Sequence, residues 1–322
     1  GNRMKIAMIG SGAAGSVFAA YLRKGGAELW LVDKYKAHMD KIAADGLVFR
    51  TPEGEEVLTG FHTSATARDI GTMDMVILMV KATQTDGVMP DVMHCVGPDT
   101  VLVSLQNGIG NDEILMKYVP AGRIMYGAGV IGTELCGPGV CISKPEDGIQ
   151  MFFGAVEKSP QTDRAGKYLE ECFEAGGCHA SFEDDVRVLL WKKAVTNSGY
   201  NAVCAVSRMR LRYVMDNDWG MKLLMNVWKE GCAVAKALGV GDIWPLIEAD
   251  IGNLRENLGD YYPSMAQDAV LHHRQTEINV LNGAIARYGE RLGIPTPYNS
   301  VLADLISCIQ DNYSNQYGME NG

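Results

Sequence analysis

The chain has 322 residues, of which 47% are hydrophobic and 21% charged, as in ordinary globular proteins. This length allows a large core and favours two domains over one. The net charge of −10 argues against a nucleic-acid groove and an anionic membrane surface as partners. No apolar run is long enough to cross a bilayer, and no signal-peptide layout is found, so we expect a cytoplasmic protein.

The cysteines and histidines do not predict a metal site. Two cysteine pairs lie close in sequence but lack C-x-x-C spacing: Cys136 with Cys141, and Cys172 with Cys178. His272 and His273 lie beside an arginine, and a solvated pair is the simpler interpretation. We therefore expect reduced, buried thiols and no metal.

Four nearly continuous apolar runs predict strands at residues 5–10, 28–33, 74–80 and 100–106. Such runs are typical of parallel strands that are covered on both faces. Amphipathic stretches at residues 16–26 and 83–96 alternate with them. This alternation predicts a Rossmann-type, doubly wound α/β sheet.

The second half of the chain has a different pattern. From about Gly127 we expect glycine-rich antiparallel strands and then a helix at residues 164–175. After Phe182 the sequence is helical almost to its end, and the acids at 183–185 suit the positive end of a helix. We predict an NAD(P)-binding domain at 4–182 and an all-α substrate and dimer domain at 183–315, with an expression remnant at 1–3 and a flexible tail at 316–322.

The segment IGSGAAGS has G-x-G-x-x-G spacing between a predicted strand and a predicted helix. Glycines let the backbone approach a pyrophosphate, which then rests on the amides at the start of the helix. We therefore predict a bound dinucleotide, with contacts from Gly10, Ser11, Gly12, Ala13, Ala14 and Gly15.

Two opposing signals bear on the choice of dinucleotide. Asp33 closes the second predicted strand, where an acid binds ribose hydroxyls, repels a 2′-phosphate and so makes NAD(H) possible. Lys34 follows it and Lys81 ends another strand, and both would pair with a 2′-phosphate. A solvated strand end explains Lys81 equally well, so these residues leave the choice between NAD(H) and NADP(H) open.

A row of polar residues marks one predicted helix. Lys193, Asn197 and Asn201 stand at i, i+4 and i+8 among apolar neighbours. Partial burial would lower the pKa of such a lysine and suit it to donate a proton to a substrate oxygen, whereas a solvated helix face is an equal alternative. Glu277, at the edge of the apolar stripe of a helix predicted to begin there, is a candidate partner for Lys193.

Two further segments complete the candidate site. Asn107, in SLQNGIGN after a strand, is either part of a turn or an amide within reach of a nicotinamide or substrate. Ser264 has capping-box spacing to Gln267, so a helix cap is the simpler interpretation.

Taken in order, these segments resemble the ketopantoate reductases (2-dehydropantoate 2-reductases). That family reduces ketopantoate to pantoate with NADPH, in pantothenate and coenzyme A biosynthesis, so the resemblance favours NADP(H) as the cofactor. The resemblance covers almost the whole chain and rests on IGSGAAG, VKATQ, LQNGIGN, LLWKKAVTNSGYNAV, PSMAQD and TEINVLNGAIARYGERLGIPTP.

The resemblance implies a role for each candidate. Lys193 would be the general acid, and Glu277 would touch the cofactor and orient that lysine. The remaining implied roles are substrate binding by Asn197, Asn201 and Ser264, a place beside nicotinamide and substrate for Asn107, and a place near the adenosine ribose for Lys34 and Lys81. The row would then face a keto acid in a cleft between domains, and Thr133 matches a cofactor contact only loosely.

The sequence departs from the family at several places. Tyr261 stands where the family often has an asparagine three residues before Ser264, and Asp33 precedes Lys34. One extra residue lies between Asp268 and Glu277. An arginine-rich segment follows the catalytic helix, with Arg208, Arg210 and Arg212 either solvated or facing a more anionic substrate.

Other functions stay open at this point. A related hydroxy-acid dehydrogenase with a different keto acid is the nearest alternative. A non-catalytic NAD(P) sensor is less favoured because Lys193, both amides and Glu277 are all present. A homodimer is possible, with residues 219–238 serving as core or as part of a dimer face.

Overall fold

The protein is made of two units. The structure, a computed structural model, describes residues 3–320. One unit holds residues 3–106 and 111–186, and the other holds residues 107–110 and 187–320. The boundary expected between residues 182 and 183 lies close to the division after Val186. The expected remnant and tail extend to residues 1–2 and 321–322, which lie outside the described residues.

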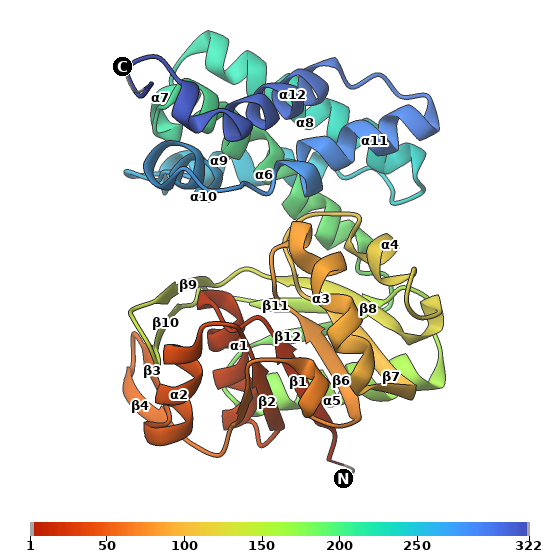
Figure 1. The fold of residues 1–322 in the computed structure, drawn as a ribbon. Coiled ribbons are helices and arrows are strands. Elements are labelled where there is room, and N and C mark those ends of the chain that lie inside the picture. The colour runs from red at the N-terminus through yellow and green to blue at the C-terminus, as the bar shows by residue number, and fades with distance from the viewer. Residues whose placement is uncertain (1–2, 321–322) are drawn as a thin grey trace. The chain divides into compact units, whose positions relative to one another are not determined.

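The first unit is built on an eight-stranded sheet with the order β12-β11-β8-β7-β6-β1-β2-β5 (Figure 1). Its strands are β1 (Lys5–Ile9), β2 (Glu28–Val32), β5 (His62–Ser64), β6 (Met73–Leu78), β7 (Val96–Ser104), β8 (Ile124–Gly129), β11 (Met151–Ala155) and β12 (Ala180–Glu183). The six neighbouring strands β5, β2, β1, β6, β7 and β8 pair in parallel. Strand β11 is antiparallel to β8 and parallel to β12. The four predicted strands are β1, β2, β6 and β7, so the predicted fold class is confirmed.

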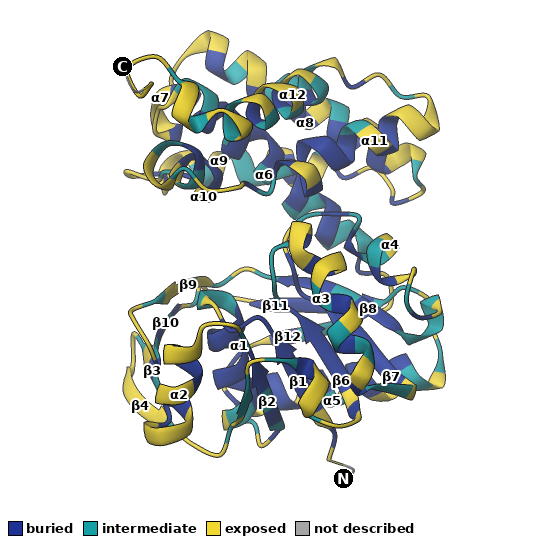
Figure 2. Ribbon diagram, viewed as in Figure 1, coloured by how far each residue is buried: buried dark blue, intermediate teal, exposed yellow. Residues whose placement is uncertain are grey.

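Both faces of this sheet are covered by helices. Ile6 and Met8 of β1 pack with α1 (Ala13–Lys24) and α5 (Pro160–Ala175), while Ala7 and Ile9 pack with α3 (Thr85–Val92) on the other side. Neighbouring strand residues point to opposite faces. Because helices cover both faces, both sets of residues are buried (Figure 2). This double burial explains the continuous apolar runs in the sequence. The short helices α2 (Lys36–Asp45) and α4 (Asn111–Leu115) complete the unit.

A second, four-stranded sheet in this unit was not predicted as such. Its order is β4-β3-β10-β9, formed by β3 (Leu47–Thr51), β4 (Gly54–Leu58), β9 (Gly132–Leu135) and β10 (Val140–Lys144). The sequence indicated antiparallel strands after Gly127 but no strands near residue 50. Most of β4 is exposed, so that strand has no apolar run to signal it.

The second unit is helical, as predicted. Its α-helices are α6 (Arg187–Ser207), α7 (Leu211–Met215), α8 (Asp218–Ala237), α9 (Trp244–Glu256), α10 (Ser264–Ala266), α11 (Asn282–Leu292) and α12 (Pro297–Asp311). The long helix α6 packs against α8 and α12. Trp228 of α8 is fully buried in the core of this unit, and its indole N–H donates to the Thr196 carbonyl of α6 (3.1 Å). In the described chain, no helix is both long and apolar enough to cross a membrane.

The segment before α11 corrects one prediction. Glu277 was expected to begin a helix, but a 3₁₀ turn at Ile278–Val280 intervenes and α11 begins at Asn282. The expected apolar stripe is nevertheless buried, since Ile278, Leu281 and Ile285 all lie in the core of the second unit. The stripe therefore follows the core, although the chain in this segment is not one continuous helix.

Candidate active site

The glycine loop joins β1 to α1 and has the backbone geometry that a pyrophosphate needs. Gly10 has φ +97°, a left-handed conformation that favours glycine. A Cβ on Gly15 would lie 2.0 Å from the Gly10 carbonyl oxygen, whereas a Cβ on Gly12 would meet no atom within 4 Å. Gly10 and Gly15 thus pack against the protein itself. Gly12, the N-cap of α1, faces open space.

A buried hydroxyl also fits a dinucleotide at this loop. Ser11 is 1% exposed, and its Oγ has no hydrogen-bond partner among the residues that the structure describes. A buried hydroxyl without a partner costs free energy unless a ligand or water satisfies it. Together with the open side of Gly12 and the N–H groups at the start of α1, this hydroxyl fits a phosphate oxygen.

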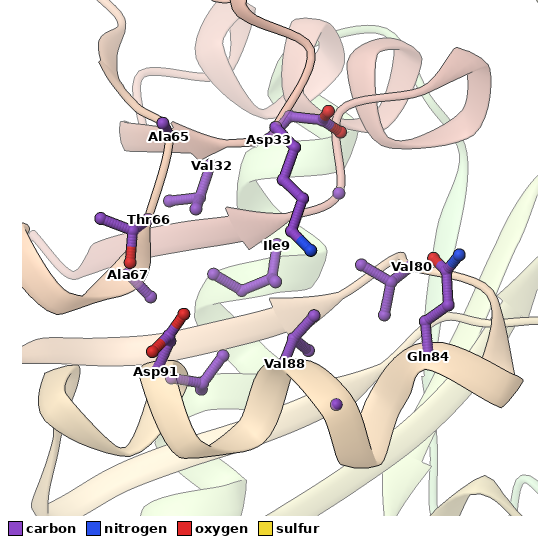
Figure 3. Close-up of a pocket in the computed structure, with 14 residues that line it drawn as sticks. Ile9, Val32, Asp33, Ala65, Thr66, Ala67, Val80, Gln84, Val88 and Asp91 are labelled. Atoms are coloured by element: carbon purple, nitrogen blue, oxygen red, sulfur yellow. The ribbon is translucent and has the colours of Figure 1, made fainter.

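Asp33 lies in a cavity of about 380 Å³ beside the glycine loop. Its carboxylate accepts hydrogen bonds from the backbone N–H groups of Ser11 (2.7 Å) and Tyr35 (2.8 Å). Figure 3 shows the mixture of apolar and charged side chains around this cavity. The lining residues are Ile9, Gly10, Val32, Asp33, Lys34, Ala65, Thr66, Ala67, Val80, Gln84, Gly87, Val88, Asp91 and Val92.

The cavity brings together some of the predicted cofactor residues. Asp33, Lys34 and Gly10 line it, and its apolar walls suit a flat adenine ring. Lys81 is instead the half-buried N-cap of a 3₁₀ turn that follows β6. The loosely matched Thr133 lies on β9 of the second sheet, where it pairs with Ser143 of β10.

In the second unit, Lys193 of α6 lies in a chain of polar contacts. Its Nζ donates to Asn107 Oδ1 (3.0 Å), and Asn107 Nδ2 donates to Glu277 Oε2 (3.4 Å). Burial lowers the pKa of Lys193 to about 8, while the Glu277 carboxylate acts to raise it. The lysine therefore stays largely protonated at neutral pH but gives up its proton readily, as a general acid must.

The neighbouring lysine has a different environment. Lys192 forms an ion pair with Asp250 (2.7 Å) on α9. Because consecutive helical residues point about 100° apart, only one of the two lysines can face the Asn107 contact. The sequence left open whether both lysines are solvated. Their contacts differ, since Lys192 pairs with Asp250 and Lys193 with Asn107.

The two asparagines below Lys193 are held by their side-chain oxygens. Asn201 Oδ1 accepts from the backbone N–H of Met265 (3.1 Å) and lies 3.5 Å from Ser264 Oγ. Since a backbone N–H can only donate, this contact fixes the orientation of the Asn201 amide. Asn197 Oδ1 accepts from the Tyr200 hydroxyl. Both asparagines can therefore offer N–H groups to a ligand, and N–H donors suit a carboxylate.

Ser264 does not cap a helix in the way its spacing suggested. It is the first residue of α10, whose N-cap is Pro263, and no side-chain capping bond forms there. The side chain of Gln267 donates instead to the Tyr262 carbonyl (2.8 Å). The exposed Ser264 thus lies beside Asn201, another residue of the candidate site.

The extra residue between Asp268 and Glu277 lies in a region that contains a π-helix, Gln267–His272. A π-turn fits one more residue than an α-turn, and such turns often mark functional sites. Glu277 still reaches Asn107 after this segment. The insertion therefore leaves the polar chain from Lys193 to Glu277 intact.

The arginine-rich segment packs against the chain around Tyr261. Arg210 donates to the Asp260 carbonyl, and Arg212 lies 3.4 Å from the Asp260 carboxylate. The backbone N–H of Leu211 donates to the Tyr261 carbonyl (3.2 Å). Arg210 and Arg212 are thus exposed side chains that contact Asp260 at the surface.

Sequence reasoning missed two contributors to this site. Tyr200 orients Asn197, and the backbone N–H of Met265 orients Asn201. Tyr200 lies one helical turn after Asn197, so its spacing was a usable signal. The Met265 contact joins residues far apart in the chain and left no sequence signal. Among residues 3–320, no group of three or more His, Cys, Asp or Glu side chains is placed to hold a metal.

The fold and the site define a class of protein. A doubly wound sheet with a glycine loop and a helical unit with a lysine of lowered pKa are the elements of a nicotinamide-dependent oxidoreductase. The family described as ketopantoate reductase PanE/ApbA matches residues 6–155, and its C-terminal part matches residues 185–310. The chain belongs to the ketopantoate reductase family.

Curated relatives agree over nearly the whole length. The chain is 31% identical to a 2-dehydropantoate 2-reductase of Pyrococcus horikoshii, covering 94% of this chain and 96% of the relative. It is 28% identical to one of Streptococcus pyogenes, covering 94% and 97%. A D-mandelate dehydrogenase solved with NADH and anilino(oxo)acetate is 29% identical, with a TM-score of 0.83 and coverage of 96% and 98%.

Proposed function

We propose that the protein reduces a 2-keto acid to a 2-hydroxy acid with NAD(P)H, using Lys193 as the general acid. The observation that carries this proposal is the contact of Lys193 with Asn107, next to Glu277, with a lysine pKa of about 8. A dihydronicotinamide, when bound, supplies the hydride to the keto carbon. Lys193 then gives its proton to the carbonyl oxygen, so that the carbonyl becomes an alcohol and the lysine becomes neutral.

The surrounding residues position the substrate and the lysine. Asn107 accepts from Nζ and so directs the ammonium group. Glu277 opposes the loss of the positive charge. The amide N–H groups of Asn197 and Asn201 would bind the substrate carboxylate, since both asparagine oxygens are already engaged. The Ser264 hydroxyl, which donates to Asn201 Oδ1 over 3.5 Å, would turn to the same carboxylate. Lys193 and the two asparagines then lie along the same face of α6, with Ser264 of α10 beside them.

Ketopantoate is the first substrate to test, because the curated relatives are named 2-dehydropantoate 2-reductases. Purified protein should oxidise NADPH or NADH when ketopantoate is added. Lys193→Ala should lower turnover by about 10²–10⁴-fold, the range expected for a lost general acid. The matched control is Lys192→Ala, which removes the neighbouring lysine and should leave turnover nearly unchanged. Equal losses in both variants would contradict the proposal.

A different keto acid is the second candidate. Tyr261 departs from the family pattern, and the D-mandelate dehydrogenase relative was solved with anilino(oxo)acetate. A panel of 2-keto acids, assayed beside ketopantoate, separates the two candidates. A non-catalytic sensor would bind the dinucleotide and turn over none of the panel.

The cofactor preference is a further part of the proposal. The resemblance to the family favours NADP(H), with Lys34 and Lys81 near the adenosine ribose. The two backbone hydrogen bonds to Asp33 support NAD(H) instead, because they hold a carboxylate in the cavity where a 2′-phosphate would lie. Asp91 adds a second carboxylate to the lining. The mandelate dehydrogenase relative was solved with NADH.

The ratio of kcat/KM for NADH and NADPH tests this preference. Wild-type protein should favour NADH. Asp33→Asn keeps the size of the side chain but removes its charge and one of its two acceptors for backbone N–H groups, and should shift the ratio toward NADPH by about tenfold or more. Asp40→Asn, on the exposed face of α2, is the control and should leave the ratio unchanged. A wild-type preference for NADPH would instead support the sequence-based choice.

Assembly and location are also proposals. Trp219 and Leu223 of α8 are exposed, at 74% and 38%, which supports a homodimer in which this face is covered. Sedimentation of wild type and Trp219→Ser would test it. A cytoplasmic location is proposed because of the similarity to the curated 2-dehydropantoate 2-reductases, and cell fractionation tests it.

A further inference from the structure

Two tyrosines form an aromatic pair beside the proposed substrate donors. The rings of Tyr200 and Tyr261 meet edge to face, with centroids 5.9 Å apart and planes at 80°. Tyr200 also donates to Asn197 Oδ1, and Tyr261 lies three residues before Ser264. The pair therefore contacts the asparagine row through Tyr200 and lies close in sequence to Ser264. Tyr261 is 43% exposed, so its ring is accessible to a ligand.

The position of Tyr261 is fixed by its surroundings. Its carbonyl accepts from Leu211 N–H (3.2 Å), and its own N–H donates to the Leu258 carbonyl (2.9 Å). Arg210 and Arg212 hold the preceding residue, Asp260. The ring itself is restrained by its edge-to-face contact with Tyr200. A ring restrained before a ligand arrives loses less conformational freedom on binding, and this favours affinity.

We propose that Tyr200 and Tyr261 form a subsite that selects 2-keto acids with an aromatic side chain over ketopantoate. The inference rests on the proposed keto-acid reduction and specifies its substrate class. A substrate anchored through its carboxylate on the donors of Asn197, Asn201 and Ser264 carries its side chain next to this pair. Edge-to-face and offset contacts with a third ring are favourable there.

Ketopantoate has different needs at the same place. Its side chain ends in a hydroxymethyl group, which needs a hydrogen-bond partner when it leaves water. An amide at position 261 would offer both a donor and an acceptor, whereas tyrosine puts a ring between the backbone and its hydroxyl. A site shaped by rings accepts an aryl group well and holds the hydroxymethyl group poorly.

The direct test compares kcat/KM for 2-oxo-2-phenylacetate and ketopantoate with the preferred nicotinamide cofactor. The wild-type ratio should favour the aryl substrate by about tenfold or more, the range expected when a pocket discriminates by apolar fit. Tyr261→Asn should reverse the preference, mainly by raising KM for the aryl substrate. Tyr261→Phe keeps the ring and should keep the preference. Tyr317→Asn, at a tyrosine that is 97% exposed, is the control and should change nothing.

The possible failures are distinguishable. A wild-type preference for ketopantoate, with good turnover, would overturn the aromatic subsite while leaving the proposed reduction intact. No turnover of either keto acid, despite cofactor binding, would overturn the reduction itself. If Tyr261→Asn does not fold, as judged by thermal unfolding, Tyr261→Leu provides a second test. It removes the ring but keeps an apolar side chain, so the preference for the aryl substrate should shrink, and an unchanged ratio would overturn the subsite.

Discussion

At the scale of single residues, the orientation of an amide decides what a site can bind. Asn201 accepts from Met265 N–H through Oδ1, so the nitrogen is the atom that it can offer to a substrate. A row of N–H donors and one ammonium group suits a carboxylate next to a carbonyl. The sequence supplies the spacing of this row, but only the contacts of its oxygens determine whether the amides offer donors or acceptors to a ligand.

Asn201→Asp tests that assignment. The change keeps the acceptor for Met265 N–H but replaces the donor by a second carboxylate oxygen, which repels an anionic substrate. We expect KM for the keto acid to rise by about tenfold or more, a loss of about 1.4 kcal/mol, with the affinity for the cofactor unchanged. Steady-state kinetics and cofactor titration measure the two quantities. An unchanged KM would place the substrate carboxylate elsewhere.

The pH dependence of reduction reports on Lys193. Its pKa is lowered to about 8 by burial, so the acid form is lost as the pH rises through that value. We expect kcat/KM for reduction to be flat near neutral pH and to fall tenfold per pH unit above about 8. Glu277→Gln removes the charge that raises the pKa, so the break should move to lower pH. A break that is unchanged in Glu277→Gln, or shifted in Lys192→Ala, would contradict this assignment.

At the scale of elements, one buried histidine joins three parts of the first unit. His38 of α2 accepts from Gly139 N–H through Nδ1 (2.8 Å), so its proton lies on Nε2, next to Ser16 Oγ of α1 (2.9 Å). Ser16 Oγ in turn donates to the Ser11 carbonyl in the glycine loop (2.8 Å). The neutral ring is thus required by its contacts, and a protonated ring would place N–H against N–H at Gly139.

This arrangement predicts acid sensitivity. Burial lowers the pKa of His38 below its ordinary value of 6.5, while Asp33 acts in the opposite direction. Below pH 6.5 the unfolded chain therefore binds a proton that the folded chain refuses, so the free energy of unfolding falls as the pH drops. His38→Asn keeps an acceptor for Gly139 and should lose less stability between pH 7.5 and 5.5 than wild type. Urea unfolding at both pH values measures this difference, and equal losses would contradict it.

The elements also show where sequence patterns are informative. Strands β1, β2, β6 and β7 are buried on both faces, so their apolar runs predicted them directly. The exposed β4 has no such run and was missed. The row from Lys193 to Asn201 follows local helical periodicity and was predictable. Residues 107–110 belong to the helical unit through long-range contacts such as Ile109 N–H to the Val280 carbonyl (2.9 Å), which no local pattern encodes.

At the scale of the whole molecule, the cofactor loop and the lysine cluster belong to different units, each with its own core. Two ligands should therefore protect different stretches of the same chain. NADH alone should slow amide hydrogen exchange at residues 10–16 and 33–35, where the glycine loop and Asp33 lie. A keto acid added to the NADH complex should extend protection to residues 193–201 and 261–265.

The magnitude and the control for this experiment follow from mass action. At a ligand concentration of 100 Kd, binding adds about 2.7 kcal/mol to the stability of the bound state, enough to slow exchange in any segment that opens only when the ligand leaves. Lys193→Ala should keep the NADH protection, because the glycine loop does not depend on the lysine. Asn201→Asp should lose the keto-acid protection while keeping the NADH protection. If instead NADH protected residues 193–201 and left residues 10–16 unchanged, the dinucleotide would bind the helical unit, and the assignment of the glycine loop would be wrong.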